Sequence, residues 1–146
     1  GLRSYFPFYE KNGDPINYAH DSCLTISNIL SSFDLNTTMG FTFISGLSKK
    51  SRIFAHCGST SLRKRYHLGV KIPDGKKCRI RVGKDWVYWK KGKAFSFYDS
   101  MEHEVLNDSD DLRILLIIDV WSDGLPNSIK KCLIENQSIL KFGTVD

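Results

Sequence analysis

The histidines are the residues of this sequence best suited to metal chemistry. There are four of them, His20, His56, His67 and His103. A neutral imidazole binds iron, copper or zinc, and non-haem iron enzymes commonly combine two histidines with one carboxylate. That carboxylate often follows as His-x-Asp, but no His-x-Asp or His-x-Glu occurs in the chain, and the residue two after His56 is Gly58. The histidines alone therefore leave structural and metal-binding roles open.

Arg113 is the second residue that invites a chemical explanation. It directly precedes residues 114–118, the longest apolar run of the chain. A guanidinium at the edge of a core needs a partner, because an unpaired buried charge is costly. Its planar fork fits a carboxylate with two parallel hydrogen bonds. That carboxylate belongs either to Asp108, Asp110 or Asp111 on the preceding segment or to a ligand, and the sequence leaves both open.

Length and composition limit what kind of scaffold can hold these residues. The chain has 146 residues, of which 41% are hydrophobic and 25% charged. These values predict one soluble globular domain over residues 1–146 and exclude a disordered, collagen-like or coiled-coil chain. No apolar run approaches the roughly 18 residues of a membrane span. The start at Gly1 without Met suits a domain excised from a longer protein, and the net charge of +5 favours anionic partners.

Alternation with a period of two indicates that strands position the candidate residues. Residues 66–72 and 78–82 alternate in this way around the turn signal at 73–75, which predicts a hairpin. Within the first of these segments, Arg65 and His67 share the face opposite Tyr66. Residues 112–121 are the most apolar segment and predict a central strand buried on both faces.

Helices are expected at only two places. Residues 22–33 have apolar groups at helical spacing, and a short final helix is predicted near Asn127 or Ser128. The chain is therefore predicted to be mainly β, a sandwich or jelly roll with one or two flanking helices. The four cysteines include no CxxC pair, so we expect free, mostly buried thiols.

Several motifs, in the same order and at the same spacing, resemble the aspartyl/asparaginyl β-hydroxylase family. The strongest are residues 56–60, 63–70, 99–107 and 113–121. The resemblance covers residues 45–121, and a weaker likeness extends to the N-terminal segment. The family is a branch of the Fe(II)- and 2-oxoglutarate-dependent dioxygenases, so the resemblance implies a double-stranded β-helix, which is a cupin-like jelly roll.

The resemblance also implies roles for individual residues. His56 and His103 would hold iron as the metal-binding and catalytic residues, with Gly58 in the place of the usual carboxylate. Positions that contact the co-substrate in the family are matched by Ser45, Arg65, His67 and Arg113. Arg113 would bind the carboxylate of 2-oxoglutarate farther from the metal.

The implied reaction consumes O2 and 2-oxoglutarate, releases succinate and CO2, and hydroxylates an unactivated carbon. In the family's type member this is the β-carbon of Asp or Asn in a protein, so we expect a protein, a peptide or a small acidic molecule as partner, and no nucleic acid. A free amino acid or a lipid acyl chain is the alternative substrate. A different alternative is a non-catalytic domain that binds a peptide or carboxylate on the same fold.

The chain departs from the family pattern in three places. Arg3 stands where the family usually has Trp, residues 46–55 lack the usual Pro-Gly-Thr, and Ser122-Asp123 replaces His-Pro. The metal and co-substrate residues are intact, whereas these departures lie where we expect substrate contacts. The first two departures, at Arg3 and at residues 46–55, are the reason to keep the non-catalytic alternative.

Overall fold

Two antiparallel sheets make up most of the computed structural model, which describes residues 2–140. The nine strands in this part of the chain are β1 (Arg3–Pro7), β2 (Thr42–Leu47), β3 (Ser51–His56), β4 (Arg63–Lys71), β5 (Cys78–Val82), β6 (Asp85–Tyr88), β7 (Ala94–Phe97), β8 (His103–Asn107) and β9 (Arg113–Trp121). The helices are α1 (Asn17–Ser22), α2 (Leu24–Leu30), α3 (Asn127–Glu135) and α4 (Gln137–Leu140). The predicted mainly β class is confirmed.

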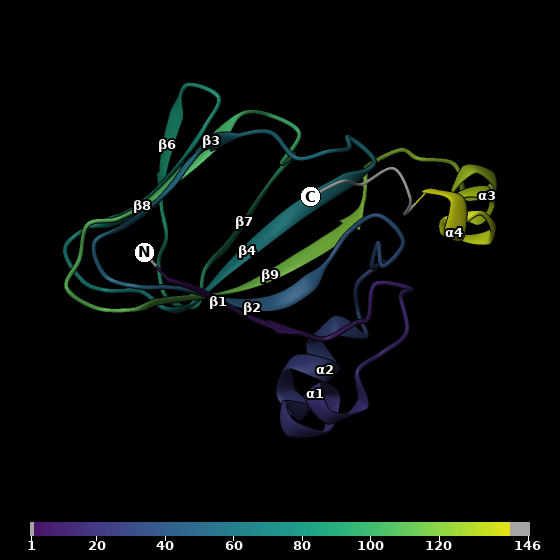
Figure 1. The fold of residues 1–146 in the computed structure, drawn as a ribbon, viewed down its shortest axis with the longest axis horizontal. Helices are drawn as coiled ribbons and strands as arrows, with labels where there is room; N and C mark the ends of the chain where they lie inside the picture. The colour runs from purple at the N-terminus through teal and green to yellow at the C-terminus, as the bar shows by residue number, and fades with distance from the viewer. Residues whose placement is uncertain (1, 141–146) are drawn as a thin grey trace.

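The five-stranded sheet has the order β1-β2-β9-β4-β7, and the four-stranded sheet has the order β3-β8-β5-β6. In Figure 1 the four-stranded sheet lies above the five-stranded sheet, and α1 and α2 lie below the five-stranded sheet. Strands that are neighbours in a sheet are mostly distant in sequence, because the chain crosses repeatedly from one sheet to the other. This crossing places residues of both sheets around one interior.

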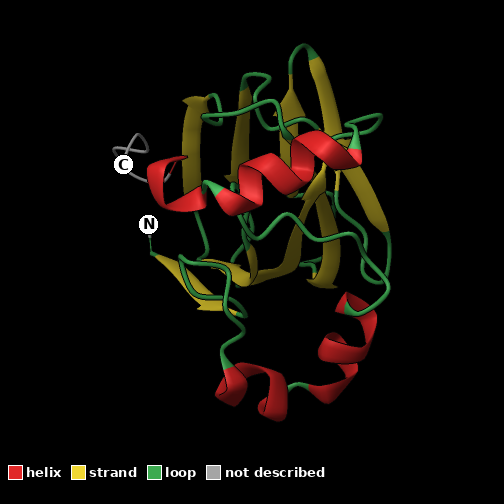
Figure 2. Ribbon diagram, turned by 90° about the vertical axis from the view of Figure 1, so that its right-hand side faces the viewer, coloured by secondary structure: helices red, strands yellow, loops and turns green. Residues whose placement is uncertain are grey.

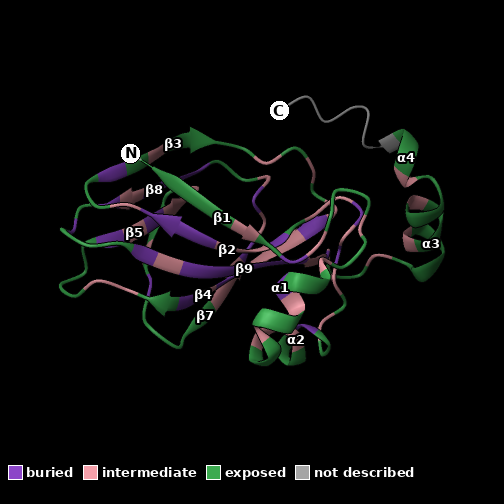
Figure 3. Cartoon of the chain, turned by 60° about the horizontal axis from the view of Figure 1, so that its bottom comes forward, coloured by how far each residue is buried: buried purple, intermediate pink, exposed green. Residues whose placement is uncertain are grey.

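Strand β9 lies at the centre of the five-stranded sheet and is buried on both faces, as the sequence predicts. Leu115 and Ile117 face the smaller sheet, where they join a core that includes Ile80 and Val105. On the other face of β9, Leu116 and Ile118 join a second core under α1 and α2, together with Phe8 and Leu30. Figure 3 shows the contrast between buried β9 and the exposed edge strand β1.

The helices differ from the prediction at the N-terminal end and agree with it at the C-terminal end. The helix expected over residues 22–33 is the shorter α2, which begins after Cys23, a residue with φ −132° and ψ 60°; α1, which precedes Cys23, was not predicted. The final helix begins at Asn127 as predicted. Figure 2 is viewed from the side of α3 and α4, which cross in front of the strands. No helix within the described residues is long and apolar enough to cross a membrane.

The predicted hairpin between residues 66–72 and 78–82 is wrong. Strand β4 pairs with β7 and β9, whereas β5 pairs with β6 and β8 in the other sheet. The turn at 73–75 therefore carries the chain between sheets instead of folding it back within one. The cysteine prediction is half right: all four thiols are free, but only Cys78 is buried.

Candidate functional site

His56 and His103 lie side by side in the four-stranded sheet. His56 ends β3, His103 begins β8, and the two are cross-strand partners with ring centroids 4.3 Å apart. Each ring makes the same local contact: Nδ1 lies 2.8 Å from the carbonyl oxygen two residues earlier, that of Phe54 or Met101. A carbonyl only accepts, so each Nδ1 carries the proton and each neutral ring keeps its Nε2 lone pair free. Metal-binding histidines are commonly oriented by such contacts.

The surroundings of His103 favour the form that can bind a metal. Burial lowers the pKa of His103, and the neighbouring His56 lowers it further, against the opposing effect of the Met101 carbonyl. The ring is therefore neutral at physiological pH, as ligation requires. Within residues 2–140 no group of three or more His, Cys, Asp or Glu side chains converges to hold an ion, so the pair stands without a carboxylate ligand.

Asp99 explains why position 58 has no side chain. A Cβ added to Gly58 would lie 2.6 Å from Cγ of Asp99, and the Gly58 N–H donates to the Asp99 carbonyl at 2.6 Å. Arg63 fixes the Asp99 carboxylate with two hydrogen bonds of 3.0 and 2.6 Å. The space that a carboxylate at position 58 would need is already filled by a carboxylate paired elsewhere.

Arg113 is an almost fully buried cation, with 2% of its surface exposed. Its Nη2 donates a long hydrogen bond of 3.4 Å to Ser45 Oγ, and its Cζ lies 5.1 Å from the centre of the Trp89 ring. Its Nε has no hydrogen-bond partner among the described residues. Burial lowers the pKa of this guanidinium to about 10, which reflects the cost of holding the charge here.

The aspartates that the sequence offered as partners of Arg113 are all paired with other cations. The pairs are Asp108 with Arg79 at 2.9 Å, Asp110 with Lys50 at 3.3 Å and Asp111 with Lys71 at 2.8 Å. The described part of the chain shows no carboxylate within 4.0 Å of the Arg113 guanidinium. The buried charge therefore has no acidic partner among the described residues, which is energetically costly.

One small cavity of about 80 Å³ brings the histidine pair and Arg113 together. No Asp or Glu is among the described residues that line it. The lining consists of Arg3, Tyr5, Phe43, Ser45, Ile53, His56, Arg65, His67, His103, Val105, Arg113 and Ile117. A cavity with cationic and imidazole groups and no acid favours a small anion.

His67 has the opposite tautomer from the histidine pair. Nε1–H of Trp89 donates to His67 Nδ1 at 3.3 Å, so the neutral ring carries its proton on Nε2. Burial lowers the pKa of His67 well below its usual value, and the charges of Arg65 and Arg113 lower it further. His67 is therefore a neutral hydrogen-bond donor rather than a ligand with a free Nε2 lone pair.

Arg65 also lines the cavity, but its charge is already paired. It donates two hydrogen bonds of 2.7 Å to the two carboxylate oxygens of Asp119, and its Nη1 lies 3.5 Å from Asp99. Asp119 in turn accepts a hydrogen bond from the backbone N–H of Phe41 at 2.8 Å. Arg65 thus differs from Arg113, which has no such carboxylate.

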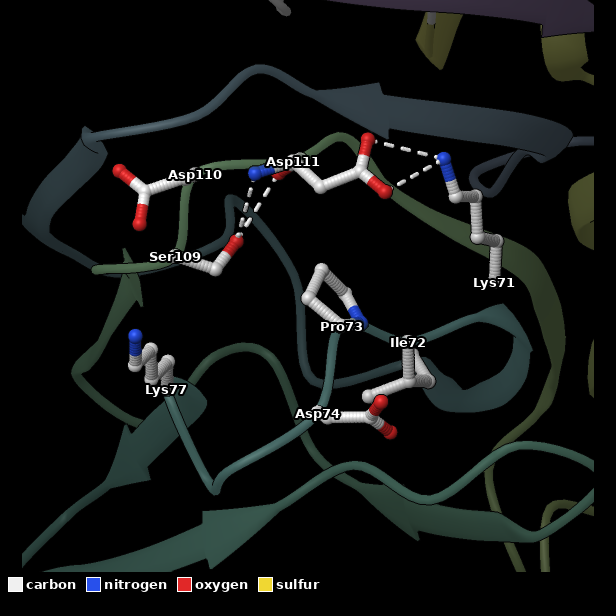
Figure 4. Close-up of a pocket in the computed structure, with 8 residues that line it drawn as sticks. All are labelled: Lys71, Ile72, Pro73, Asp74, Lys77, Ser109, Asp110 and Asp111. Carbon is white, nitrogen blue, oxygen red and sulfur yellow. Dashed lines mark hydrogen bonds and ion pairs between the residues drawn. The ribbon is translucent and has the colours of Figure 1, made fainter.

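A larger and more open cavity, of about 470 Å³, lies elsewhere between the turn after β4 and the segment before β9. Figure 4 shows that Lys71 contacts both carboxylate oxygens of Asp111 across this cavity. None of its described lining residues is a histidine or cysteine. The histidine pair therefore makes the smaller cavity the candidate functional site.

Comparison with known proteins identifies the family of the chain. The family model described as aspartyl/asparaginyl β-hydroxylase matches residues 4–123. The chain belongs to the aspartyl/asparaginyl β-hydroxylase family. The resemblance predicted from the motifs is thereby confirmed.

The curated relatives in this family are longer proteins. The human protein named aspartyl/asparaginyl β-hydroxylase is 37% identical over 83 residues, which cover 57% of this chain and 11% of that protein. Human aspartate β-hydroxylase domain-containing protein 1 is 33% identical over 107 residues, covering 71% of this chain and 27% of that protein. The chain thus matches less than a third of the length of these relatives.

Solved structures similar to this β-hydroxylase family member identify the fold as cupin-like. The cupin domain of a transcriptional regulator from Enterobacter cloacae aligns with a TM-score of 0.54 and 8% identity, covering 84% of this chain and 99% of that one. A predicted oxalate decarboxylase from Thermotoga maritima aligns with a TM-score of 0.53 and 9% identity, covering 84% of this chain and 83% of that one. The predicted jelly-roll architecture is confirmed.

The structure gathers every site residue that the family resemblance assigns. They come from β2, β3, β4, β8 and β9 and are Ser45, His56, Arg65, His67, His103 and Arg113. Arg3 and Tyr5 of β1 also line the cavity, although sequence reasoning did not place them there. The only signal was the departure from the family's Trp at position 3.

Proposed function

We propose that this chain is an Fe(II)- and 2-oxoglutarate-dependent hydroxylase. The observation that carries the proposal is that one cavity joins two imidazoles with free Nε2 lone pairs to a buried guanidinium without a carboxylate. A metal ion satisfies the first feature and a carboxylate the second. 2-Oxoglutarate offers a chelating end for the metal and a second carboxylate for the arginine.

His56 and His103 would hold the iron. Both are oriented through Nδ1 before any metal binds, so little reorganisation is needed. Gly58 has no side chain to offer as a ligand, so the two imidazoles would be the ligands that the protein supplies. When bound, the iron supplies the O2 activation that couples oxidative decarboxylation of 2-oxoglutarate to hydroxylation of the substrate.

The remaining residues of the cavity would bind and orient the co-substrate. Arg113 would form two parallel hydrogen bonds with the far carboxylate, assisted by the Ser45 hydroxyl. His67 would donate its Nε2–H to a co-substrate oxygen while remaining neutral. Because Arg113 and the histidine pair belong to different sheets, the sandwich itself sets the distance between the two ends of the ligand.

For the substrate we propose the β-carbon of an Asp or Asn in a protein or peptide. The names of the relatives describe β-hydroxylation of these residues. The basic lining of the cavity supports an acidic substrate, but it suits a free acidic amino acid as well. A panel of acidic peptides and free aspartate would separate these two classes. Mass spectrometry shows which of them gains one oxygen atom during the reaction.

The first test is an anaerobic titration of the metal-free protein with Fe(II) and then 2-oxoglutarate, followed by the visible charge-transfer band. The band is expected in the wild type and not in His103→Ala. A folded wild-type protein without the band would contradict the proposal and would favour the non-catalytic binding domain. Succinate release stimulated by iron would exclude that alternative.

A further inference from the structure

The edge strand β1 forms one wall of the cavity. Arg3 and Tyr5 lie two residues apart on this strand, and both line the cavity. Arg3 Nη1 donates to the Tyr5 hydroxyl oxygen at 3.1 Å, and the Tyr5 ring lies 5.3 Å from that of Phe43. Tyr5 therefore holds the Arg3 side chain in place beside the opening.

Arg3 and Arg113 belong to the same cross-strand row. Arg3 is paired with Leu47 of β2, and Leu47 is paired with Arg113 of β9. Residues directly opposite in an antiparallel sheet project from the same face, so both arginines flank Leu47 on the side of the cavity. After burial, which is the largest effect, the charge of Arg3 further lowers the pKa of Arg113.

Neither arginine has a carboxylate partner in the described part of the chain. The ion pairs of residues 2–140 include Arg52, Arg63, Arg65, Arg79 and Arg81, but not Arg3 or Arg113. Two neighbouring cations that share a cavity without an acid repel each other when the cavity is empty. An anion between them removes this repulsion and gains charge-assisted hydrogen bonds.

We infer that Arg3 is a second anion-binding residue of this site, which holds the far carboxylate of 2-oxoglutarate together with Arg113, with Tyr5 as its positioning residue. This inference rests on the proposed function. Arg113 supplies the buried contact, and Arg3 supplies a solvent-exposed contact from the edge of the sheet. The carboxylate is thereby bound from a third strand, β1, in addition to β9 and β2.

The test compares Arg3→Gln with the matched variant Lys84→Gln. Lys84 is exposed in the turn between β5 and β6, does not line the cavity, and loses the same charge. The dissociation constant of 2-oxoglutarate is measured by anaerobic calorimetry on Fe(II)-loaded protein. Loss of one exposed charge-assisted contact should weaken binding about tenfold in Arg3→Gln. Lys84→Gln should remain within about twofold of the wild type, because long-range charge effects are screened at physiological salt.

A second ligand locates the contact. 2-Oxopentanoate has the same chain length and metal-binding end as 2-oxoglutarate but lacks the far carboxylate. Arg3→Gln and the wild type should bind it equally. An equal loss for both ligands, or unchanged binding of 2-oxoglutarate, would overturn the inference, and in the latter case a raised KM for a peptide would assign Arg3 to the substrate. If the wild type itself fails to bind 2-oxoglutarate, the proposed function fails first.

Discussion

Replacing Arg113 by Met should make the empty protein more stable while removing its affinity for 2-oxoglutarate. Burial lowers the pKa of Arg113 to about 10. A free guanidinium titrates above about 12, and each tenfold change in the ionisation constant corresponds to about 1.4 kcal/mol, so the buried charge costs about 3 kcal/mol. Met is of similar length and removes that cost together with the unpaired Nε.

Two favourable contacts are lost in the same substitution. The position over the Trp89 ring contributes about 1 kcal/mol, and the long hydrogen bond to Ser45 contributes less. The net gain in the free energy of unfolding is therefore about 1–2 kcal/mol. At about 2–4 °C per kcal/mol for a chain of this size, Tm should rise by about 2–8 °C.

The assay is thermal unfolding followed by circular dichroism, without metal and in a buffer free of carboxylate and phosphate. Arg63→Met is the matched control, since Arg63 is also buried but is paired with Asp99. Removing it leaves that carboxylate unpaired and should cost about 3–5 kcal/mol. The two substitutions are thus expected to change Tm in opposite directions.

Addition of 2-oxoglutarate to the Fe(II)-loaded protein under anaerobic conditions should then raise the Tm of the wild type and leave that of Arg113→Met nearly unchanged. A loss of more than about 2 kcal/mol in the metal-free Arg113→Met protein would refute the reasoning, because it would show that the guanidinium stabilises the empty fold.

Three further predictions follow from the same geometry. Gly58→Ala should lose about 1–3 kcal/mol of unfolding free energy in urea, because its Cβ would collide with Asp99, whereas Gly46→Ala, with contacts of 3.5 Å, should be tolerated. His67→Gln should flatten the pH dependence of stability. The pKa of His67 is lower in the folded chain than its unfolded value of about 6.5, so the unfolded state binds more protons below that pH and stability falls as pH falls, by up to about 1.4 kcal/mol per pH unit. Urea unfolding between pH 7 and 5 measures this slope, and equal slopes in both proteins would contradict it. His103→Ala should lose bound iron, measured by metal analysis, and keep its far-ultraviolet spectrum. Iron retained at the wild-type level would exclude His103 as a ligand.

The sequence was sufficient for the elements whose pattern reflects burial on both faces. Strand β9 was predictable because Leu115 and Leu116 face two different cores and both must be apolar. The predicted hairpin failed because a turn at 73–75 has the same local chemistry whether the chain returns within a sheet or crosses to another. Strand β4 pairs instead with β7 and β9, and that choice depends on contacts with residues distant in the sequence.

The site was predictable as a set of residues but not as a set of charges. Alternation placed Arg65 and His67 on one face, yet it could not show that Asp119 neutralises Arg65. For the partner of Arg113 the sequence left a local aspartate and a ligand carboxylate equally open. The structure excludes the local aspartates, because Lys50, Lys71 and Arg79 already pair with them. Arg3 lies more than 100 residues from Arg113 in the chain, so no local pattern links them.

The division of the site between two sheets has a mechanical consequence. His56 and His103 belong to the four-stranded sheet, whereas Ser45 and Arg113 belong to the five-stranded sheet. A ligand bound by both groups of residues therefore links the two sheets, and they cannot separate until the ligand dissociates from one of them. Occupancy should lengthen the lifetime of the folded chain as well as raise its equilibrium stability. The spacing between the two sheets would then limit the length of any ligand that bridges them.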